Sequence, residues 1–274
     1  MKRTVFFVSD RTGITVETLA HSLLTQFEGI DFDMIKAPFI DTPEKARLLA
    51  ERINRISEGG KPRPLVFSTL IEQDMREYIE QSNALVLDMF EAFIRPLEKE
   101  LGIHSSHAVG RSHSMGSNGG YKARIDAINF ALANDDGITT SHYDEADIVL
   151  IGVSRSGKTP TCLYLALQFG ILAANYPLTD EDLQSEQLPK ALKPWRRKLH
   201  GLSISAERLC QIRNERRPNS QYSSLSQCEY EVGAVEAMYQ RDNVPFINTG
   251  TMSIEEIATF IMNERGIERR WYGG

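Results

Sequence analysis

IVLIGVSRSGKTPT, residues 148–161, is the stretch that decides the fold of this chain. Its apolar beginning, Ile148 to Val153, predicts a buried β-strand. The spacing from Gly152 to Thr159 fits G-x-x-x-x-G-K-[ST], which is typical of a loop that cradles phosphates. Pro160 is tolerated only in the first turn of a helix, so a helix is expected to begin here. We therefore predict a strand, a glycine loop and a helix in this order.

The residues of this loop are the first candidates for a functional site. Glycines let the backbone fold so that its N–H groups point at phosphate oxygens. Lys158 would add a positive charge, and the Thr159 hydroxyl would ligate Mg²⁺; both are also catalytic candidates. The Arg155 guanidinium would either meet a phosphate or form a surface salt bridge. The full set of candidate binding residues is Gly152, Val153, Ser154, Arg155, Ser156, Gly157, Lys158 and Thr159.

An acidic residue should complete a magnesium site, but none follows the strands expected after the loop. The first of those strands ends in Asn175, and the last one also ends in asparagine. Asp88 follows an apolar run, but it lies in the other half of the chain and fits a helix N-cap. Asp135 and Asp136 stand shortly before the loop strand and are the candidate catalytic or metal-binding acids. The alternative for them is an Asx turn beside Gly137.

Two further groups are candidates for contacts with phosphate or with a partner. Arg216 and Arg217 stand with Arg213 in RNERRPNSQY, where Pro218 breaks the helix. Arginines on such segments close over phosphates in kinases, and a solvated helix face is the alternative.

The other group is SDRTGIT, residues 9–15, which follows an expected strand. Asp10, Thr12 and Gly13 would lie at the carboxyl end of that strand, where open α/β sheets bind ligands. A turn with an N-cap is the alternative.

Strand-like and helix-like runs alternate along the whole chain, which favours a parallel sheet. One helix is expected over 15–27, with an apolar face of Val16, Leu19, Ala20, Leu23, Leu24 and Phe27, and another with Thr42 as its N-cap and Pro43 at its first position. The composition changes within 102–120, where HSSHAVGRSHSMGSNGG offers little core material. Its histidines lack metal-ligand spacing, so we interpret them as solvated linker residues. We predict an N-terminal α/β domain, 1–105, and a second α/β domain with a mainly parallel sheet and the glycine loop, 106–274.

Composition narrows the class of protein. The 274 residues are 41% hydrophobic and 25% charged, with a net charge of −6. This balance is that of a soluble globular protein, and it disfavours nucleic acid as the main partner. No apolar run approaches the roughly 20 residues of a membrane span. Three cysteines far apart and a short apolar start indicate a reducing, cytoplasmic setting.

Five segments together resemble one family, the bacterial phosphoenolpyruvate synthase regulatory proteins and the related plant pyruvate, phosphate dikinase regulatory proteins. They cover nearly the whole chain. The segments are VSDRTGITVETLAHSLLTQF, YKARIDAINFALANDDG, GVSRSGKTPTCLYLALQFGILAANYPL, RNERRPNSQYSS and FINTGTMSIEEIA.

The resemblance implies a P-loop kinase-like domain in a bifunctional enzyme. Such proteins phosphorylate a threonine of phosphoenolpyruvate synthase with ADP, which inactivates it. They remove that phosphate with inorganic phosphate and form pyrophosphate. The family often has histidine before the two aspartates, and Asn134 stands there in this chain. A homodimer would suit a protein that acts on a dimeric target.

Three alternatives remain open from the sequence. The same chemistry could act on pyruvate, phosphate dikinase. The chain could be an ATP-dependent small-molecule kinase, although the missing acid and the long first domain count against that. It could also be a nucleotide-sensing regulator that binds DNA, which the negative net charge disfavours.

Overall fold

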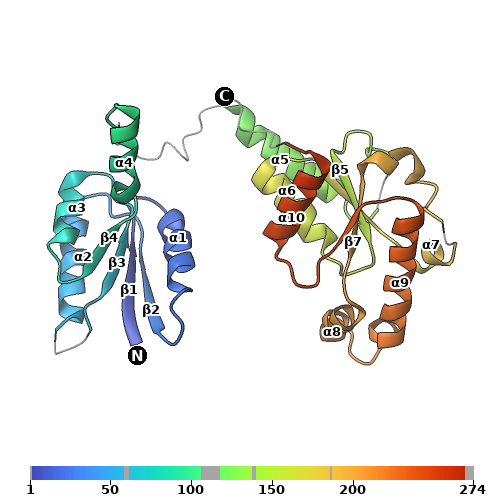
Figure 1. The fold of residues 1–274 in the computed structure, drawn as a ribbon, viewed down its shortest axis with the longest axis horizontal. Helices are drawn as coiled ribbons and strands as arrows, with labels where there is room; N and C mark the ends of the chain where they lie inside the picture. Colours follow the sequence, from blue (N-terminus) through green and yellow to red (C-terminus); the bar gives the residue numbers. More distant parts are fainter. Residues whose placement is uncertain (1, 59–61, 106–117, 138–139, 186, 269–274) are drawn as a thin grey trace. The chain divides into compact units, whose positions relative to one another are not determined.

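The computed structural model describes residues 2–58, 62–105, 118–137, 140–185 and 187–268. The chain divides into two compact units, Met1–Ser114 and Met115–Gly274, and each is described here by itself (Figure 1). The boundary that we predict within 102–120 lies mostly at 106–117, outside the described residues, as does most of the histidine-rich stretch.

The first unit alternates strands and helices as the sequence predicts. Its four strands form a parallel sheet in the order β2-β1-β3-β4. Its elements are β1 (Lys2–Val8), α1 (Ile14–Leu24), β2 (Asp31–Ala37), α2 (Pro43–Ile56), β3 (Leu65–Ser68), α3 (Gln73–Glu80), β4 (Leu85–Asp88) and α4 (Glu91–Leu101).

Helices cover both faces of this first sheet. Helices α2 and α3 pack on one face against Phe6, Val8 and Val66, and α1 packs on the other against Val5 and Phe7. Figure 1 shows α1 on the side of the sheet opposite α2 and α3. Alternate residues of β1 therefore enter two separate cores, because successive side chains of a strand point to opposite faces.

The second unit contains the glycine loop. Its parallel sheet has the order β6-β5-β7-β8, so the loop strand β5 is central. Its elements are α5 (Asn118–Ala133), β5 (Ile148–Gly152), α6 (Lys158–Phe169), β6 (Ala173–Pro177), α7 (Asp180–Gln184), η1 (Lys193–Lys198), β7 (Leu199–Ser203), α8 (Ala206–Arg216), η2 (Gln221–Ser223), α9 (Leu225–Arg241), β8 (Phe246–Asn248) and α10 (Ile254–Arg265).

The core of the second unit also has two halves, one on each face of the sheet. Helices α5, α6 and α10 cover the face that carries Ile148 and Leu150. Helices α7, α8 and α9 cover the face that carries Val149 and Ile151 (Figure 1). All five residues of β5 are buried, which explains its uninterrupted apolar sequence.

The predicted α/β class with parallel sheets is confirmed. Thr42 is the N-cap of α2, as predicted: its side chain accepts a hydrogen bond from the Lys45 amide, and Pro43 follows it as the first residue of the helix. The helix expected over 15–27 is wrong at its end, since α1 ends at Leu24. Half of its predicted apolar stripe is also solvent-exposed: Leu19, Leu23 and Phe27. Within the described part of the chain, no helix has the length and apolar character needed to cross a membrane.

Candidate active site

The glycine loop joins β5 to α6, and both of its glycines are required by geometry. A Cβ at Gly152 would lie 2.5 Å from the Leu202 carbonyl oxygen, so no side chain fits there. Gly157 has a φ of +94° and precedes α6 without any side-chain cap. The first N–H groups of α6 therefore have no side-chain acceptor, and a helix start of this kind attracts anions.

Lys158 is the first residue of α6, directly after the loop glycine Gly157, and is buried. Its Nζ donates a hydrogen bond to the Val153 carbonyl oxygen at 2.9 Å. Burial lowers the pKa of Lys158 to about 8, although the nearby Asp136 and Asp135 carboxylates favour its charged form. A cavity of about 250 Å³ adjoins the loop and is lined by Asp136, Ser154, Arg155, Gly157, Lys158, Thr159 and Pro160.

The two predicted acids do lie beside the loop. The Thr159 hydroxyl donates to Asp135 Oδ1 at 2.9 Å, and the Asn175 amide also donates to that carboxylate. The Asp136 amide donates to Asn175 Oδ1 at 3.1 Å, and Asp136 lines the cavity. Asp136 and Gly137 both have positive φ, so the chain turns at these residues. The Gly137 amide donates to the Asn175 carbonyl oxygen and not to the Asp135 side chain, as an Asx turn would require. The turn is what carries the two acids to the loop.

This group of oxygen atoms fits a magnesium ion. Mg²⁺ is usually held by one or two carboxylates together with substrate phosphates. The Thr159 hydroxyl and Asp135 would hold it here, with Asn175 positioning Asp135. Such an ion would neutralise charge on phosphate oxygens. The described residues contain no group of three or more His, Cys, Asp or Glu side chains suited to a metal.

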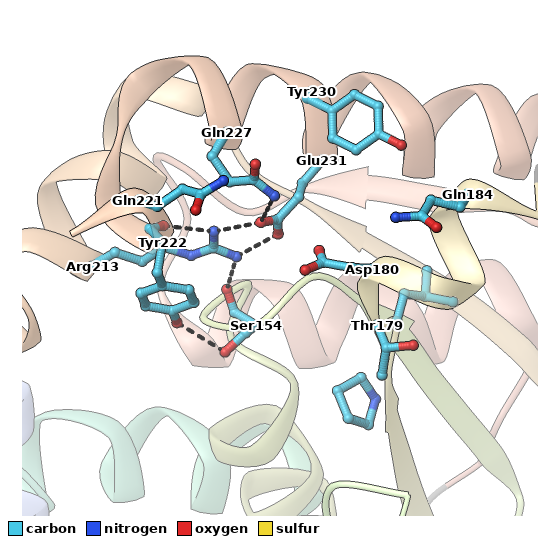
Figure 2. A pocket seen from close by; sticks show the side chains of 12 residues that line it. Ser154, Thr179, Asp180, Gln184, Arg213, Gln221, Tyr222, Gln227, Tyr230 and Glu231 are labelled. Atoms are coloured by element: carbon cyan, nitrogen blue, oxygen red, sulfur yellow. Dashed lines mark hydrogen bonds and ion pairs between the residues drawn. The ribbon is translucent and has the colours of Figure 1, made fainter.

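Arg213 contacts the glycine loop from within the core, whereas the sequence predicts it on a segment that closes over phosphate. Its side chain is fully buried and pairs with Glu231 at 2.6 Å, so it is not on a mobile surface segment. The guanidinium also donates to the carbonyl oxygens of Ser154 and Tyr222, at 3.2 and 3.0 Å. Figure 2 shows these contacts together with the Tyr222 hydroxyl, which lies 3.1 Å from Ser154 Oγ.

Arg216 and Arg217 follow directly and remain exposed. Together with Arg155 and Tyr222 they line a hollow of about 380 Å³. None of the three arginines forms an ion pair with a described residue, so the surface salt bridge considered for Arg155 is absent there. Arg155 also has a φ of +77°, a left-handed conformation that costs free energy in a non-glycine residue. Three unpaired guanidinium groups make this hollow suitable for an anion.

Sequence reasoning missed two residues of the site. Asn175 was read only as a strand end without an acid, yet its amide links Asp135, Thr159 and Asp136. Glu231 was not singled out. It occupies the buried face of α9 in the series Cys228, Glu231, Val235, Met238. An acid at that spacing on an apolar helix face predicts a buried cationic partner, so the sequence itself contains a signal for Glu231.

The remaining candidates, Asp10, Thr12 and Gly13, belong to the first unit and follow β1. Gly13 has a φ of +78° and caps α1, as the turn alternative predicted. Thr12 is exposed. Asp10 is buried, its Oδ2 has no hydrogen-bond partner among the described residues, and burial raises its pKa. The glycine loop and the side chains described around it all belong to the second unit.

The fold and the site define a class of protein: a parallel α/β protein with a helix-capping glycine loop, a buried lysine, two adjacent carboxylates and a basic hollow. Comparison with known proteins gives the family. The kinase/pyrophosphorylase family profile matches residues 5–262. The chain belongs to this family, and a phosphotransferase-type activity follows from it.

Full-length relatives agree with this assignment. A protein of Pseudomonas putida (strain GB-1) is 55% identical over 271 residues, which cover 99% of this chain and 100% of the relative. One from Pseudomonas aeruginosa (strain LESB58) is 55% identical and covered to 99% on both sides. One from Marinobacter nauticus is 56% identical over 269 residues, 98% of this chain and 99% of the relative. All three carry the provisional name phosphoenolpyruvate synthase regulatory protein.

Proposed function

We propose that this protein is a bifunctional regulator of phosphoenolpyruvate synthase, which it phosphorylates on a threonine with ADP and dephosphorylates with inorganic phosphate. One observation carries the proposal: Lys158 and Thr159 of the glycine loop share a cavity with Asp136, and Asp135 contacts Thr159. Cationic, hydroxyl and carboxylate groups in one place are what phosphoryl transfer in either direction needs.

In the kinase direction, the loop holds the diphosphate of ADP. The threonine oxygen forms a bond to the β-phosphorus, and the bond from that phosphorus to the bridging oxygen breaks. AMP leaves, and the threonine proton is released. Asp136, which lines the cavity, orients the threonine hydroxyl and accepts its proton. Asp135 and Thr159 would hold Mg²⁺, and Lys158 neutralises charge on the phosphate oxygens.

In the reverse direction, inorganic phosphate takes part of the same position. One of its oxygens forms a bond to the phosphorus of phosphothreonine, and the bond from phosphorus to the threonine oxygen breaks. The products are pyrophosphate and threonine, whose oxygen takes up a proton. The arginine-lined hollow of Arg155, Arg216 and Arg217 adjoins the loop and supplies charge for a second phosphate group.

The target is proposed from the relatives, whose names describe regulation of phosphoenolpyruvate synthase. Pyruvate, phosphate dikinase is the second candidate, because the same chemistry would act on it. An ATP-dependent small-molecule kinase is less well supported, since this chain matches the kinase/pyrophosphorylase family and aligns with its relatives over their full length.

The proposal is tested by incubating the purified protein with phosphoenolpyruvate synthase and either ADP or ATP. ADP should give phosphothreonine, mapped by mass spectrometry, together with an equal amount of AMP and loss of synthase activity. Adding inorganic phosphate to the isolated phosphorylated synthase should release pyrophosphate and restore activity. Phosphorylation with ATP but not with ADP, in preparations free of interconverting enzymes, would overturn the proposal. Replacing the synthase by the dikinase separates the two candidate targets.

A further inference from the structure

A second and larger cavity adjoins the glycine loop at Ser154, which lines both cavities. It measures about 660 Å³, within the range of ligand-binding sites. One wall is formed by residues 177–180 and Gln184, at the two ends of α7, and the other by Arg213, η2 and the first turns of α9 (Figure 2). Both walls lie at the carboxyl ends of β6 and β7, the strands on either side of β5.

Three polar side chains of this cavity have no hydrogen-bond partner among the described residues. Asp180, Gln184 and Tyr230 line it, and their side chains form no hydrogen bond with the described residues. In Figure 2 the Asp180 carboxylate points across the cavity toward Glu231. Hydrogen-bond donors and acceptors are therefore available on both walls for a polar ligand.

The charge of this cavity is opposite to that of the hollow beside it. Arg213 is neutralised by Glu231, with which it forms a buried ion pair. Asp180 has no such partner, so the lining carries one uncompensated negative charge. The neighbouring hollow is lined by three unpaired arginines instead. A phosphate group is therefore favoured in the hollow and disfavoured in the larger cavity.

We infer that the larger cavity binds the polypeptide segment of the target protein that carries the acceptor threonine. The assignment rests on the proposed function. In-line transfer requires the acceptor to approach the phosphorus from the side opposite the leaving group. Thr159, Pro160 and Ser154 all line the smaller cavity, and Ser154 lines the larger cavity as well. A segment in the larger cavity reaches the loop past Ser154, and its N–H groups or a cationic side chain meet Asp180.

The nucleoside of the donor is the competing occupant, since tyrosine and glutamine side chains also bind bases. Two observations favour the polypeptide. The cavity is larger than the phosphate cavity by more than twofold, 660 against 250 Å³. Its free side chains are spread over two facing walls, which suits an extended segment that needs hydrogen bonds along both sides.

The test compares Asp180→Asn and Tyr230→Ala with wild type. Glu181→Gln is the matched control, because Glu181 lies in the same turn of α7 and is exposed, but does not line the cavity. We expect each test variant to raise the KM for the target protein about tenfold, the effect of losing one hydrogen bond to a charged group. ADP affinity, measured by calorimetry, should not change, and Glu181→Gln should match wild type in both.

Three results would overturn the assignment. If both test variants weaken ADP binding and leave the KM for the target protein unchanged, the cavity binds the nucleoside. If neither quantity changes, the cavity has no role in binding, although the proposed function stands because wild type remains active. If wild type does not phosphorylate the synthase with ADP at all, the proposed function fails, and this assignment fails with it.

Discussion

The Thr159 hydroxyl lies 2.9 Å from Asp135 Oδ1, and this contact links the glycine loop to the turn before β5. In the proposed site Asp135 would hold Mg²⁺ together with Thr159, whereas Asp136 lines the cavity. Replacing each of the two acids should therefore affect the rate and the Mg²⁺ requirement differently. Asp135→Asn should lower both activities about 100-fold and raise the Mg²⁺ concentration needed for half-maximal rate about tenfold.

Asp136→Asn should lower the rate by a similar factor, because a general base contributes about 100-fold or more, but should leave the Mg²⁺ requirement unchanged. Initial rates of AMP and pyrophosphate formation, measured over a Mg²⁺ titration, check both variants. If Asp136→Asn shifts the Mg²⁺ requirement and Asp135→Asn does not, the two roles are reversed.

Lys158 should be required in both directions, since one cradle serves both. Lys158→Ala removes the only lysine that lines the cavity beside the loop. We expect ADP-dependent phosphorylation and phosphate-dependent release to fall together by at least about 100-fold. Circular dichroism would confirm that the variant is folded. If Lys158→Ala no longer phosphorylates the target protein but still removes phosphate from phosphothreonine at the wild-type rate, the two activities use separate cradles.

The Arg213–Glu231 pair should contribute to the free energy of unfolding and, separately, Arg213 should position the glycine loop. Arg213→Met leaves Glu231 buried without its partner, which costs about 3–5 kcal/mol of unfolding free energy. The double variant Arg213→Met, Glu231→Leu should recover most of that loss, because an apolar pair needs no compensation.

ADP affinity should be lower in the double variant than in wild type, since the hydrogen bond from Arg213 to the Ser154 carbonyl oxygen is absent. Urea denaturation gives the first quantity and calorimetry the second. A double variant with wild-type ADP affinity would show that Arg213 does not position the loop.

The sequence predicts most of the fold because its signals are local. The apolar run before Gly152, the glycines and Pro160 each constrain the backbone where they stand, and β5, the loop and α6 form as expected. The end of α1 was misjudged, because Leu23 and Phe27 continue the apolar spacing although both are exposed. Spacing shows which side chains share a helix face, but not whether anything covers that face.

The site is only partly predictable for the same reason. The loop residues are contiguous, so they were found together. The contact from Asn175 to Asp135 joins residues that are 40 positions apart, and it depends on the pairing of β5 with β6. Arg213 illustrates the limit most clearly. Its neighbours in the chain, Arg216 and Arg217, are exposed as expected, but one helical turn earlier Arg213 points into the core toward Glu231.

Arg216 and Arg217 should contribute to phosphate binding and not to the free energy of unfolding. Both are exposed and without an ionic partner among the described residues, so replacing them by alanine should change the unfolding free energy by less than about 0.5 kcal/mol. The KM for inorganic phosphate should rise about tenfold in the double variant, the effect expected from losing charge-assisted hydrogen bonds. Arg208→Ala, on the same helix but outside the hollow, is the control. An unchanged KM for phosphate would remove the hollow from the site.

His200 should make the second unit sensitive to acid. It lies fully buried in β7, and neither ring nitrogen has a hydrogen-bond partner in the described part of the chain, although Glu264 Oε2 is 3.5 Å from Nδ1. Burial lowers the pKa of His200 to about 4, with Arg265 acting in the same direction. Between about pH 4 and 6.5 the unfolded chain therefore binds more protons than the folded chain, and stability falls as the pH falls.

The loss across that range should reach about 3 kcal/mol in wild type, from a pKa shift of roughly 2.5 units. Urea denaturation at pH 7 and at pH 4 measures it. His200→Gln should lose less stability than wild type between these two pH values, because its side chain does not titrate. The control is His142→Gln, which replaces an exposed histidine and should keep the wild-type difference. If His200→Gln loses as much stability as wild type, the acid sensitivity has its origin in other groups, because protonation of His200 would then contribute nothing to it.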